Sequence, residues 1–493
     1  MHVTGNVSLN DGSKLATTIS ETGNGKLDIT GHLTSSDEAS IIAWLDGIQV
    51  FTGDTFTVAT ATGGFTGLPE VDQTVLLHWF ATTSGNDLNI TADIVDAGDI
   101  EGVSRPGAAA VNALLGFEND LGIAMLNLDD EADVAKAANQ LSPETNFATQ
   151  QAAITLNSAI GQHIDTRLAS VGGTGSYGQY AQPSGLGMQP PSGPSMKQSD
   201  PNRSNLGGSL KDDPDFVAPR SAALWGQAFG AGMDQNERDL VDGYNARLYG
   251  IIAGYDNWVS PGVRLGIAGG YANTNIDGKG DTRQNSTSID SYLIEAYGSV
   301  KGTGWYMTGR TGFTWHDYDT VRVLTVPVSD RAKGSHDGRQ FNAAIEIGAP
   351  LRQSGSIITP VASLTYSNLE QDAYTETSDG GMALSVESQS NDSLVSALGL
   401  KALVPIANDT VLEGRAMWLH EFADTAQVVT ASFAAGGGTF TAAGPDVGRD
   451  SAGLGIGLLG EINASTTFEL NYDANVRPDF LAHIGSARLN VKF

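Results

Sequence analysis

The sequence of 493 residues contains no cysteine and few positive charges, with 27 Lys and Arg against 56 Asp and Glu. The absence of cysteine excludes disulfides and thiolate metal sites, and it suits a chain that crosses an oxidising compartment unfolded. The formal net charge of −29 makes the chain a polyanion, which nucleic acid repels. These deficits argue against nucleic-acid binding and are compatible with an exported surface protein.

Long apolar runs are also missing. No window approaches the roughly 18–20 apolar residues that a transmembrane helix needs. A β-barrel spans a bilayer without such a run, because its strand residues alternate between lipid and lumen. The first residues, Met1 to Gly5, have neither the basic segment nor the apolar core of a signal peptide. We therefore expect this sequence to be the C-terminal part of a longer exported product.

Four regions of the chain differ in composition. Residues 1–105 alternate strand-like runs such as Asp87–Val95 with Gly, Asn and Asp turns, which predicts a β-solenoid-like region, either the end of a stacked β-solenoid or a small β-domain. Residues 106–170 are rich in Ala and favour helices. Residues 171–219 are rich in Gly, Pro, Ser and Gln without aliphatic periodicity, which predicts a flexible linker. Residues 220–493 return to strand patterns.

One long helix is predicted in the second region. Ser142 followed by Pro143 offers an N-cap and a proline at the first helical position. The apolar residues that then recur at spacings of three and four are Ala153, Leu156, Ile160, Ile164 and Leu168. This pattern predicts a helix over Pro143–Ser170. At 1.5 Å per residue it is roughly 40 Å long, enough to cross a hydrocarbon core of ~30 Å.

The last region contains twelve strand-length segments with period-two alternation. In the clearest of them, Phe468–Arg477, apolar residues alternate with charged and polar ones. The connections are alternately long, as at 275–287, and short, as at Ser260-Pro261-Gly262. Short turns at one rim and long loops at the other are typical of outer-membrane barrels. The pattern therefore predicts a mostly β protein with a twelve-stranded antiparallel transmembrane β-barrel over 220–493.

Two further patterns are typical of outer-membrane barrels: aromatic residues near strand ends and an aromatic residue at the end of the last strand. Aromatic residues near strand ends predict the interfacial girdles of this barrel; these are Trp225, Trp258, Trp305, Trp315, Tyr318, Trp418 and Phe422. The chain stops in an alternating strand with Ala487, Leu489, Val491 and the terminal Phe493. This ending resembles the signal by which bacterial outer-membrane proteins are recognised for assembly.

Charged residues on the inward faces of the predicted strands are expected to line the lumen. They are Glu295, Arg310, Glu346, Glu413, Arg415, Glu469, Asp473, Arg477 and Arg488. A solvated network of opposite charges explains this set better than an active site. HExxH, GxSxG, P-loop and dinucleotide-binding motifs are absent, and the eight histidines are scattered. We therefore predict no catalytic residue, no cofactor and no metal site.

Taken together, these features resemble a monomeric autotransporter of the type V secretion class. Three segments carry the resemblance in the expected order: Ala137–Glu144 (AANQLSPE) before a helix, Ala223–Gly230 (ALWGQAFG) at the start of the barrel, and the terminal strand ending in Phe493. Residues 1–100 resemble more loosely the last β-helical turns of a passenger, as in Gly53–Val58 (GDTFTV). The resemblance implies a twelve-stranded barrel, a helix in its pore, and a passenger at the surface of a Gram-negative cell.

The resemblance also implies partners. These are outer-membrane lipid and lipopolysaccharide, the barrel assembly machinery and periplasmic chaperones, without nucleic acid. Two alternatives remain at this stage: a porin-like outer-membrane channel, and a carrier for an enzymatic passenger missing from this sequence. The occupant of the pore is also open between the Pro143–Ser170 helix and the linker at 171–219. The sequence does not indicate what the passenger binds or whether it is cleaved.

Overall fold

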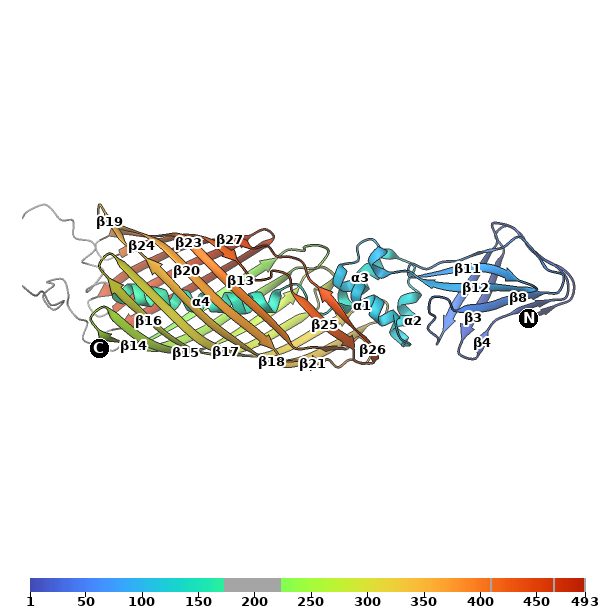
Figure 1. Ribbon diagram of the computed structural model, residues 1–493, viewed down its shortest axis with the longest axis horizontal. Helices are drawn as coiled ribbons and strands as arrows, with labels where there is room; N and C mark the ends of the chain where they lie inside the picture. Colours follow the sequence, from blue (N-terminus) through green and yellow to red (C-terminus); the bar gives the residue numbers. More distant parts are fainter. Residues whose placement is uncertain (173–222, 408–409, 464–465, 492–493) are drawn as a thin grey trace, which may run out of the picture.

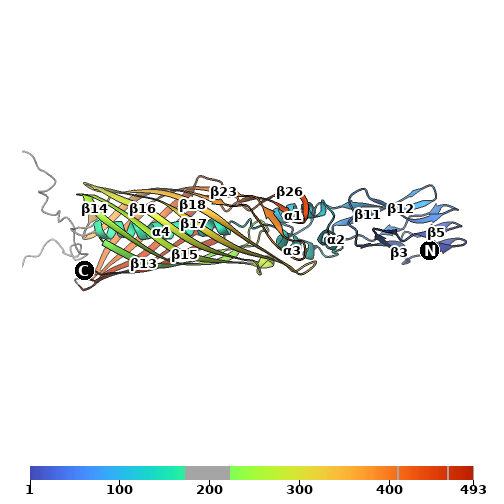
Figure 2. The ribbon, with the colours of Figure 1, turned by 90° about the horizontal axis from the view of Figure 1, so that it is seen from below.

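A computed structural model describes residues 1–172, 223–407, 410–463 and 466–491. The molecule is elongated, with a barrel, a group of helices and a β-region following one another along its long axis (Figures 1 and 2). Nearly all of the predicted linker at 171–219 lies outside the described residues. Among the helices that are described, none has both the length and the apolar character of a membrane span.

The first 71 residues pass three times through three parallel sheets. The first sheet contains β1 (His2–Val3), β5 (Leu27–Ile29) and β8 (Thr55–Ala61); the second contains β2 (Val7–Leu9), β6 (Leu33–Ser35) and β9 (Phe65–Thr66); the third contains β3 (Lys14–Ser20), β7 (Ser40–Asp46) and β10 (Glu70–Val71). The short β4 (Gly23–Asn24) pairs with β3. Inward apolar residues such as Ile19, Leu33 and Ile41 are fully buried between the sheets.

An antiparallel hairpin closes this stack on the side of the helices. Its strands, β11 (Leu77–Ser84) and β12 (Asp87–Ile94), extend the first sheet beyond β8. Leu77, Trp79, Leu88 and Ile90 of the hairpin are buried in the same apolar core. The strand prediction for this region is confirmed, whereas its place in a longer solenoid stays a prediction.

Helices follow the hairpin. They are η1 (Ala97–Asp99), α1 (Arg105–Leu115), α2 (Asp120–Leu126), α3 (Glu131–Leu141) and α4 (Ala148–Gly172). The helices α1, α2 and α3 each begin at a side-chain cap: Ser104, Asn119 and Asp130 accept hydrogen bonds from the backbone N–H groups of the first turn. Their apolar faces continue the core of the β-region.

The predicted helix start at Pro143 is wrong. Ser142 is the C-cap of α3 rather than an N-cap, since its N–H donates to the Ala138 carbonyl at 3.1 Å. Its backbone is extended, with φ −60° and ψ 140°, which is the conformation that a following proline imposes. The Ser-Pro pair therefore ends one helix, and α4 starts only at Ala148, after Phe147 with a φ of 67°.

Twelve antiparallel strands form the closed barrel. They are β13 (Ala223–Gln235), β14 (Tyr244–Ser260), β15 (Val263–Gly278), β16 (Ser286–Gly302), β17 (Trp305–Leu324), β18 (Asp330–Gly348), β20 (Ser356–Gln371), β23 (Gln389–Ala407), β24 (Thr410–Glu421), β27 (Asp450–Asn463), β28 (Thr466–Arg477) and β29 (Phe480–Val491). The sheet closes because β13 pairs with both β14 and β29. The short β19 (Leu351–Gln353) pairs with β20. The twelve-stranded prediction is confirmed.

The two rims of the barrel differ, as the loop lengths predicted. One rim has tight turns such as Pro261-Gly262, where Gly262 takes a φ of 79° that favours glycine. The other rim carries η4 (Gly280–Thr282) and a four-stranded sheet made by two long loops. The strands of that sheet are β21 (Tyr374–Thr375), β22 (Leu384–Val386), β25 (Val428–Phe433) and β26 (Gly436–Ala443). It packs against α1 and the residues that follow it, with the rings of Phe117 and Phe433 6.2 Å apart.

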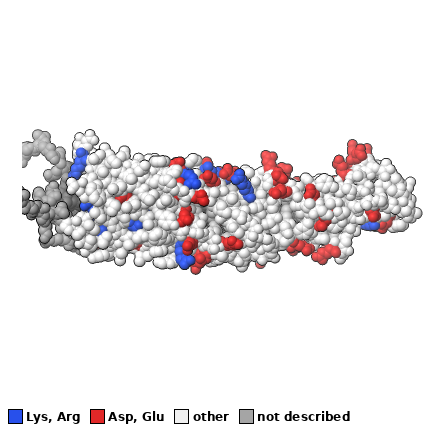
Figure 3. Space-filling model, in the orientation of Figure 1, with Lys and Arg blue, Asp and Glu red and all other residues white. Residues whose placement is uncertain are grey.

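The outer wall of the barrel is apolar. Ile251, Ile267, Phe313 and Leu454 point outward and are more than half exposed. Soluble monomers rarely leave so broad an apolar surface in water, so this band faces lipid. On the face drawn in Figure 3, charged side chains are sparse over the barrel and gather towards the end that carries the helices.

The girdle prediction is right for some aromatic residues and wrong for others. Trp305, Trp315, Trp418 and Phe422 are 41–55% exposed on the outer wall. Trp225 and Tyr318 are 4% and 1% exposed and point inward, and Trp258 stacks under the Arg264 guanidinium. Successive side chains of a strand face opposite sides of the sheet, so nearness to a strand end does not decide which face an aromatic residue occupies.

Candidate functional site: the occupied lumen

The helix α4 lies inside the barrel and runs along its axis (Figures 1 and 2). Its small residues Ala148, Ala152 and Ala159 and its apolar residues Leu156 and Ile160 are buried against the inner wall. The wall contributes Trp225, Phe229, Leu248, Ile252, Leu293 and Tyr297 to the same apolar cluster. Twelve strands enclose a lumen between the filled eight-stranded and the open sixteen-stranded type, and here a single helix takes that space.

Halfway along α4, Arg310 of β17 binds the helix. Its guanidinium donates to the side-chain and backbone oxygens of Asn157, at 2.6 and 3.2 Å. It also donates to Asn342 at 3.1 Å and lies 3.7 Å from the Glu295 carboxylate. A Cβ on Gly161 would lie 2.9 Å from the guanidinium. Glycine at this position therefore allows the arginine to approach the helix.

A second arginine reaches the helix from the last strand. Arg488 of β29 donates to the backbone carbonyl of His163 at 2.8 Å. The same guanidinium donates to Gln227 at 2.6 and 2.9 Å and to Glu469 at 3.1 Å. Arg488 thus joins α4 to β13, β28 and β29, where the barrel closes.

Near the short-turn rim, one carboxylate holds two guanidinium groups. Asp256 of β14 is fully buried and accepts hydrogen bonds from Arg167 of α4, at 3.1 and 3.3 Å, and from Arg264 of β15. The Tyr297 hydroxyl donates to the same carboxylate at 3.0 Å. Because buried charges need partners, this group ties the helix strongly to the wall.

On the opposite side of the lumen, a chain of charges runs between strands. Asp165 of α4 accepts from Thr308 at 3.2 Å. Glu346 accepts from Lys401 at 2.6 Å and from Tyr306 at 2.9 Å. Arg415 pairs with Glu413 at 3.0 Å and with Asp473 at 2.8 Å. Acidic and basic groups alternate, so the charges offset one another within the wall.

Eight of the nine residues expected to line the lumen fall into four groups. These groups are Glu295 with Arg310, Glu346 with Lys401, Glu413 with Arg415 and Asp473, and Glu469 with Arg488. Arg477 lies apart, with its guanidinium 4.2 Å from the Phe480 ring centre. Glu295, Glu469 and Arg488 are at most 3% exposed. Most of the network is shielded from water, with Glu413, Arg415 and Lys401 half-buried, instead of being solvated as expected.

Five charged groups of this site are not among the nine residues expected to line the lumen: Asp165, Arg167, Asp256, Arg264 and Lys401. The two on α4 depend on the helix being inside the barrel, which the sequence left open. Asp256 has a simple signal, because it shares the inward face of β14 with Tyr244, Leu248 and Ile252. Counting every second residue along this strand would therefore have placed Asp256 on the inward face.

The expected assembly signal is described only in part. Ala487 lies in β29 with its side chain exposed. The backbones of Leu489 and Val491 pair with Phe468 and Thr466 of β28. Their side chains and Phe493 lie outside the described residues. Over the described residues, no group of three or more His, Asp or Glu side chains is arranged to hold a metal ion.

Comparison with known proteins gives one family match. A family described as Autotransporter beta-domain matches residues 224–473, about half of the chain. Among curated proteins, an extracellular serine protease of Serratia marcescens is 26% identical over 288 residues, which cover 58% of this chain and 26% of that protein. Outer membrane protein B of Rickettsia conorii is 22% identical over 286 residues, covering 55% of this chain and 17% of that protein. The chain thus spans about a quarter or less of the length of these two relatives.

Solved structures include a similar barrel. The translocator domain of the autotransporter NalP from Neisseria meningitidis aligns with a TM-score of 0.46 and 16% identity. The alignment covers 57% of this chain and 90% of that one.

Proposed function

Because this chain belongs to the autotransporter family and is an outer-membrane translocator of a Gram-negative bacterium, we propose that its barrel exports the preceding residues through the lumen and then anchors them at the cell surface. The observation that carries this proposal is the path of the chain. The β-region and the helices α1 to α3 lie on the long-loop side of the barrel, α4 runs through the lumen, and β13 begins at the short-turn rim (Figure 1).

The contacts of α4 support a plug that stays after export. Its polar groups meet wall partners at several levels of the lumen, from Asn157 to Arg167. A porin-like channel, the first alternative, needs an open aqueous lumen. A helix tied to the wall by buried charges is therefore better explained as the fixed end of an exported chain.

The region before α1 supports a passenger role for residues 1–71. Its strands stack in parallel, and the first strands, β1 and β2, pair on one side only. Strand edges of this kind accept further strands. We therefore propose that these three turns are the last ones of a longer β-solenoid passenger.

An enzymatic passenger upstream is the second candidate. Two similar proteins are extracellular serine proteases, and this chain spans 26% and 28% of their lengths. The coding sequence upstream of residue 1 would decide this question, since a protease passenger requires a nucleophile and a base there.

Partners follow from the two surfaces of the barrel. The outward apolar band is suited to lipid, and the rim with the long loops to lipopolysaccharide. We further propose that the barrel assembly machinery recognises the terminal strand at 487–493, after periplasmic chaperones have kept the chain unfolded.

Surface digestion of intact cells tests the direction of export. We expect added protease to remove residues 1–130 from intact cells, because the part of the chain before α3 lies outside the long-loop rim, while the barrel stays protected. An antibody against residues 1–94 and a gel of unheated samples report the two parts separately. If residues 1–130 survive until the outer membrane is broken, they are periplasmic and the proposed export is wrong.

The terminal residue is predicted to act in biogenesis. Replacing Phe493 with Asp should lower the amount of assembled barrel several-fold without a matching loss of heat stability in the barrels that do assemble, because the last strand must be recognised before it closes the sheet. Quantitative immunoblots of outer-membrane fractions measure the amount, and Phe493→Tyr is the aromatic control. Wild-type amounts of the Asp variant would contradict the assembly signal.

A further inference from the structure

The C-terminal end of the helix α3 has no positively charged side chain from its own last turn. The last four carbonyl groups of any α-helix lack an intrahelical partner, and the helix dipole places partial negative charge on them. The last turn of α3 carries no basic residue, and its C-cap Ser142 satisfies only the Ala138 carbonyl. The carbonyls of Gln140, Leu141 and Ser142 therefore need donors from elsewhere.

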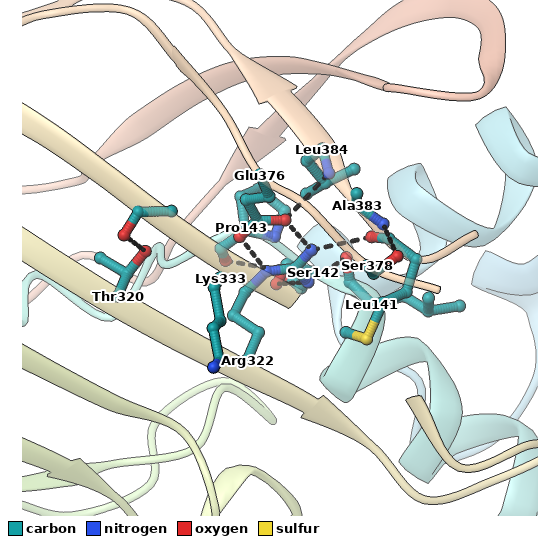
Figure 4. Close-up of polar contacts among 12 residues, drawn as sticks. Leu141, Ser142, Pro143, Thr320, Arg322, Lys333, Glu376, Ser378, Ala383 and Leu384 are labelled. Carbon is teal, nitrogen blue, oxygen red and sulfur yellow. Dashed lines mark hydrogen bonds and ion pairs between the residues drawn. The ribbon is translucent and has the colours of Figure 1, made fainter. Parts of the chain in front are cut away.

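Arg322 of β17 supplies those donors (Figure 4). A single nitrogen, Nη1, donates to the carbonyls of Gln140, Leu141 and Ser142 at 3.1, 3.0 and 3.2 Å. Arg322 is 6% exposed and lies at the long-loop end of its strand. A cation thus faces the negative end of the helix dipole in a site with little water to screen it.

A long loop holds this arginine in place. Glu376 accepts from Nε at 2.8 Å and from Nη2 at 2.6 Å, and the Met382 carbonyl accepts from Nη2 at 3.0 Å. Glu376 also accepts from the Leu384 N–H at 2.9 Å, so the loop fixes the carboxylate as well. Bidentate pairing restricts the guanidinium to one orientation, in which Nη1 points at the helix end.

The side chains of α3 are recognised at the same rim. The amide nitrogen of Gln140 donates to the Asp281 carbonyl at 2.8 Å, and its oxygen accepts from the Thr325 N–H at 2.8 Å. Asn139 donates to the Asp281 carboxylate at 3.3 Å. All these partners belong to the barrel, whereas Asn139 to Ser142 belong to the segment that precedes it. The barrel mouth thus makes specific hydrogen bonds with residues of the segment Ala137–Glu144, one of the three segments that carried the family resemblance.

We propose that Arg322, oriented by Glu376, is a binding site for the carbonyl end of α3, which stops the emerging chain and sets the axial position of α4 in the lumen. This inference rests on the proposed export. A shift of the chain by one residue moves the carbonyls by 1.5 Å in a helix or about 3.3 Å in a strand, which takes them out of hydrogen-bonding distance. The site therefore accepts one position of the chain and disfavours its neighbours.

Disulfide cross-linking tests the axial position directly, because the chain has no native cysteine. Thr308→Cys on the wall is paired with Asp165→Cys, its contact in the structure, or with Leu168→Cys, about one helical turn further along α4. In the wild-type background we expect cross-links at 165. With Arg322→Gln, the ratio of cross-links at 165 to those at 168 should fall about tenfold or more, because one charge-assisted hydrogen bond already contributes about that factor and Arg322 makes three to the end of α3.

A matched arginine controls for the loss of charge. Arg339→Gln removes a guanidinium from neighbouring β18 whose partner, Glu370, is exposed on the outer wall at 3.4 Å. It should leave the 165-to-168 ratio unchanged. Arg322→Lys keeps the charge but not the planar fork, and it should restore the ratio in part. The temperature at which the folded band disappears is measured on every sample, so that a weakened barrel is distinguished from a shifted helix.

Glu376→Gln serves if Arg322→Gln fails to assemble, since it keeps the donors of Arg322 and removes only the carboxylate that orients them. An assembled Arg322 or Glu376 variant with the wild-type cross-linking ratio would overturn the inference. Surface digestion is run in parallel. Protected residues 1–130 in the wild type would refute export itself, whereas normal export with an unchanged ratio would refute only the role of Arg322.

Discussion

Removal of residues 1–172 is expected to turn the barrel into an open channel, with a single-channel conductance about tenfold or more above that of the full chain. The full chain fills its lumen with α4, and apolar side chains of the helix pack against the wall around Trp225 and Leu248. Without the helix the lumen contains only wall side chains and water. Recordings in planar lipid bilayers measure the difference.

A helix that is present but loosened provides the control for this experiment. Gly161→Leu places a side chain where the Arg310 guanidinium now lies, so we expect conductance that fluctuates between closed and partly open levels. Conductance of the truncated barrel equal to that of the full chain would mean that the wall alone closes the pore. Loss of the folded band on unheated gels would identify a truncated barrel that has not assembled.

Replacing Asp256 with Ala should lower the free energy of unfolding by about 3–5 kcal/mol, the cost of leaving a buried charge without its partner. The carboxylate is fully buried and serves both Arg167 and Arg264, so its loss leaves two guanidinium groups with one counter-charge fewer. Asp256→Asn keeps an oxygen acceptor and should lie between the two. Urea unfolding in lipid vesicles, followed by the folded band, measures the effect.

An exposed carboxylate provides the reference for this prediction. Glu370→Ala removes the partner of Arg339 on the outer surface, where both side chains are more than half exposed. Exposed ion pairs contribute about 0–1 kcal/mol, so this variant should unfold close to the wild type. Equal effects of the two substitutions would contradict the buried role of Asp256.

The barrel could be predicted from the sequence because its physical requirements are local. Each strand must present apolar side chains to lipid at every second residue, and each turn must be short at the rim that faces the periplasm. Phe468–Arg477 meets the first condition and Ser260-Pro261-Gly262 the second, with no knowledge of distant residues. The alternation of side chains along each strand also placed Glu295, Glu469 and Arg488 on the inward face, and in the structure all three are buried.

Local sequence signals gave a wrong prediction where the same residues are compatible with two different structures. Ser142-Pro143 has the composition of a helix start, but the restriction that proline places on the preceding residue also ends helices. The choice depended on α3, whose last carbonyls are satisfied by Arg322, 180 to 182 residues later in the chain. Trp225 and Tyr318 were misplaced for a related reason, since nearness to a strand end says nothing about the face of the sheet.

Alternation and loop length are properties of adjacent residues, and for this reason the order of the regions, the number of barrel strands, the unequal rims and the family resemblance could be inferred before the fold was known. The fold was needed to show that α4 fills the lumen and which wall residue meets each of its charges. Helix and linker both have the length to thread the pore, and the Gln, Asn, His and Arg residues of the helix favoured it without identifying their partners on the wall. The decision rests on contacts between residues far apart in the chain, such as Arg488 with His163 and Arg310 with Asn157. A buried charge is stable only beside a group that pairs with it or forms hydrogen bonds to it. Closure of the barrel sheet brings these groups, which lie far apart in the sequence, next to one another.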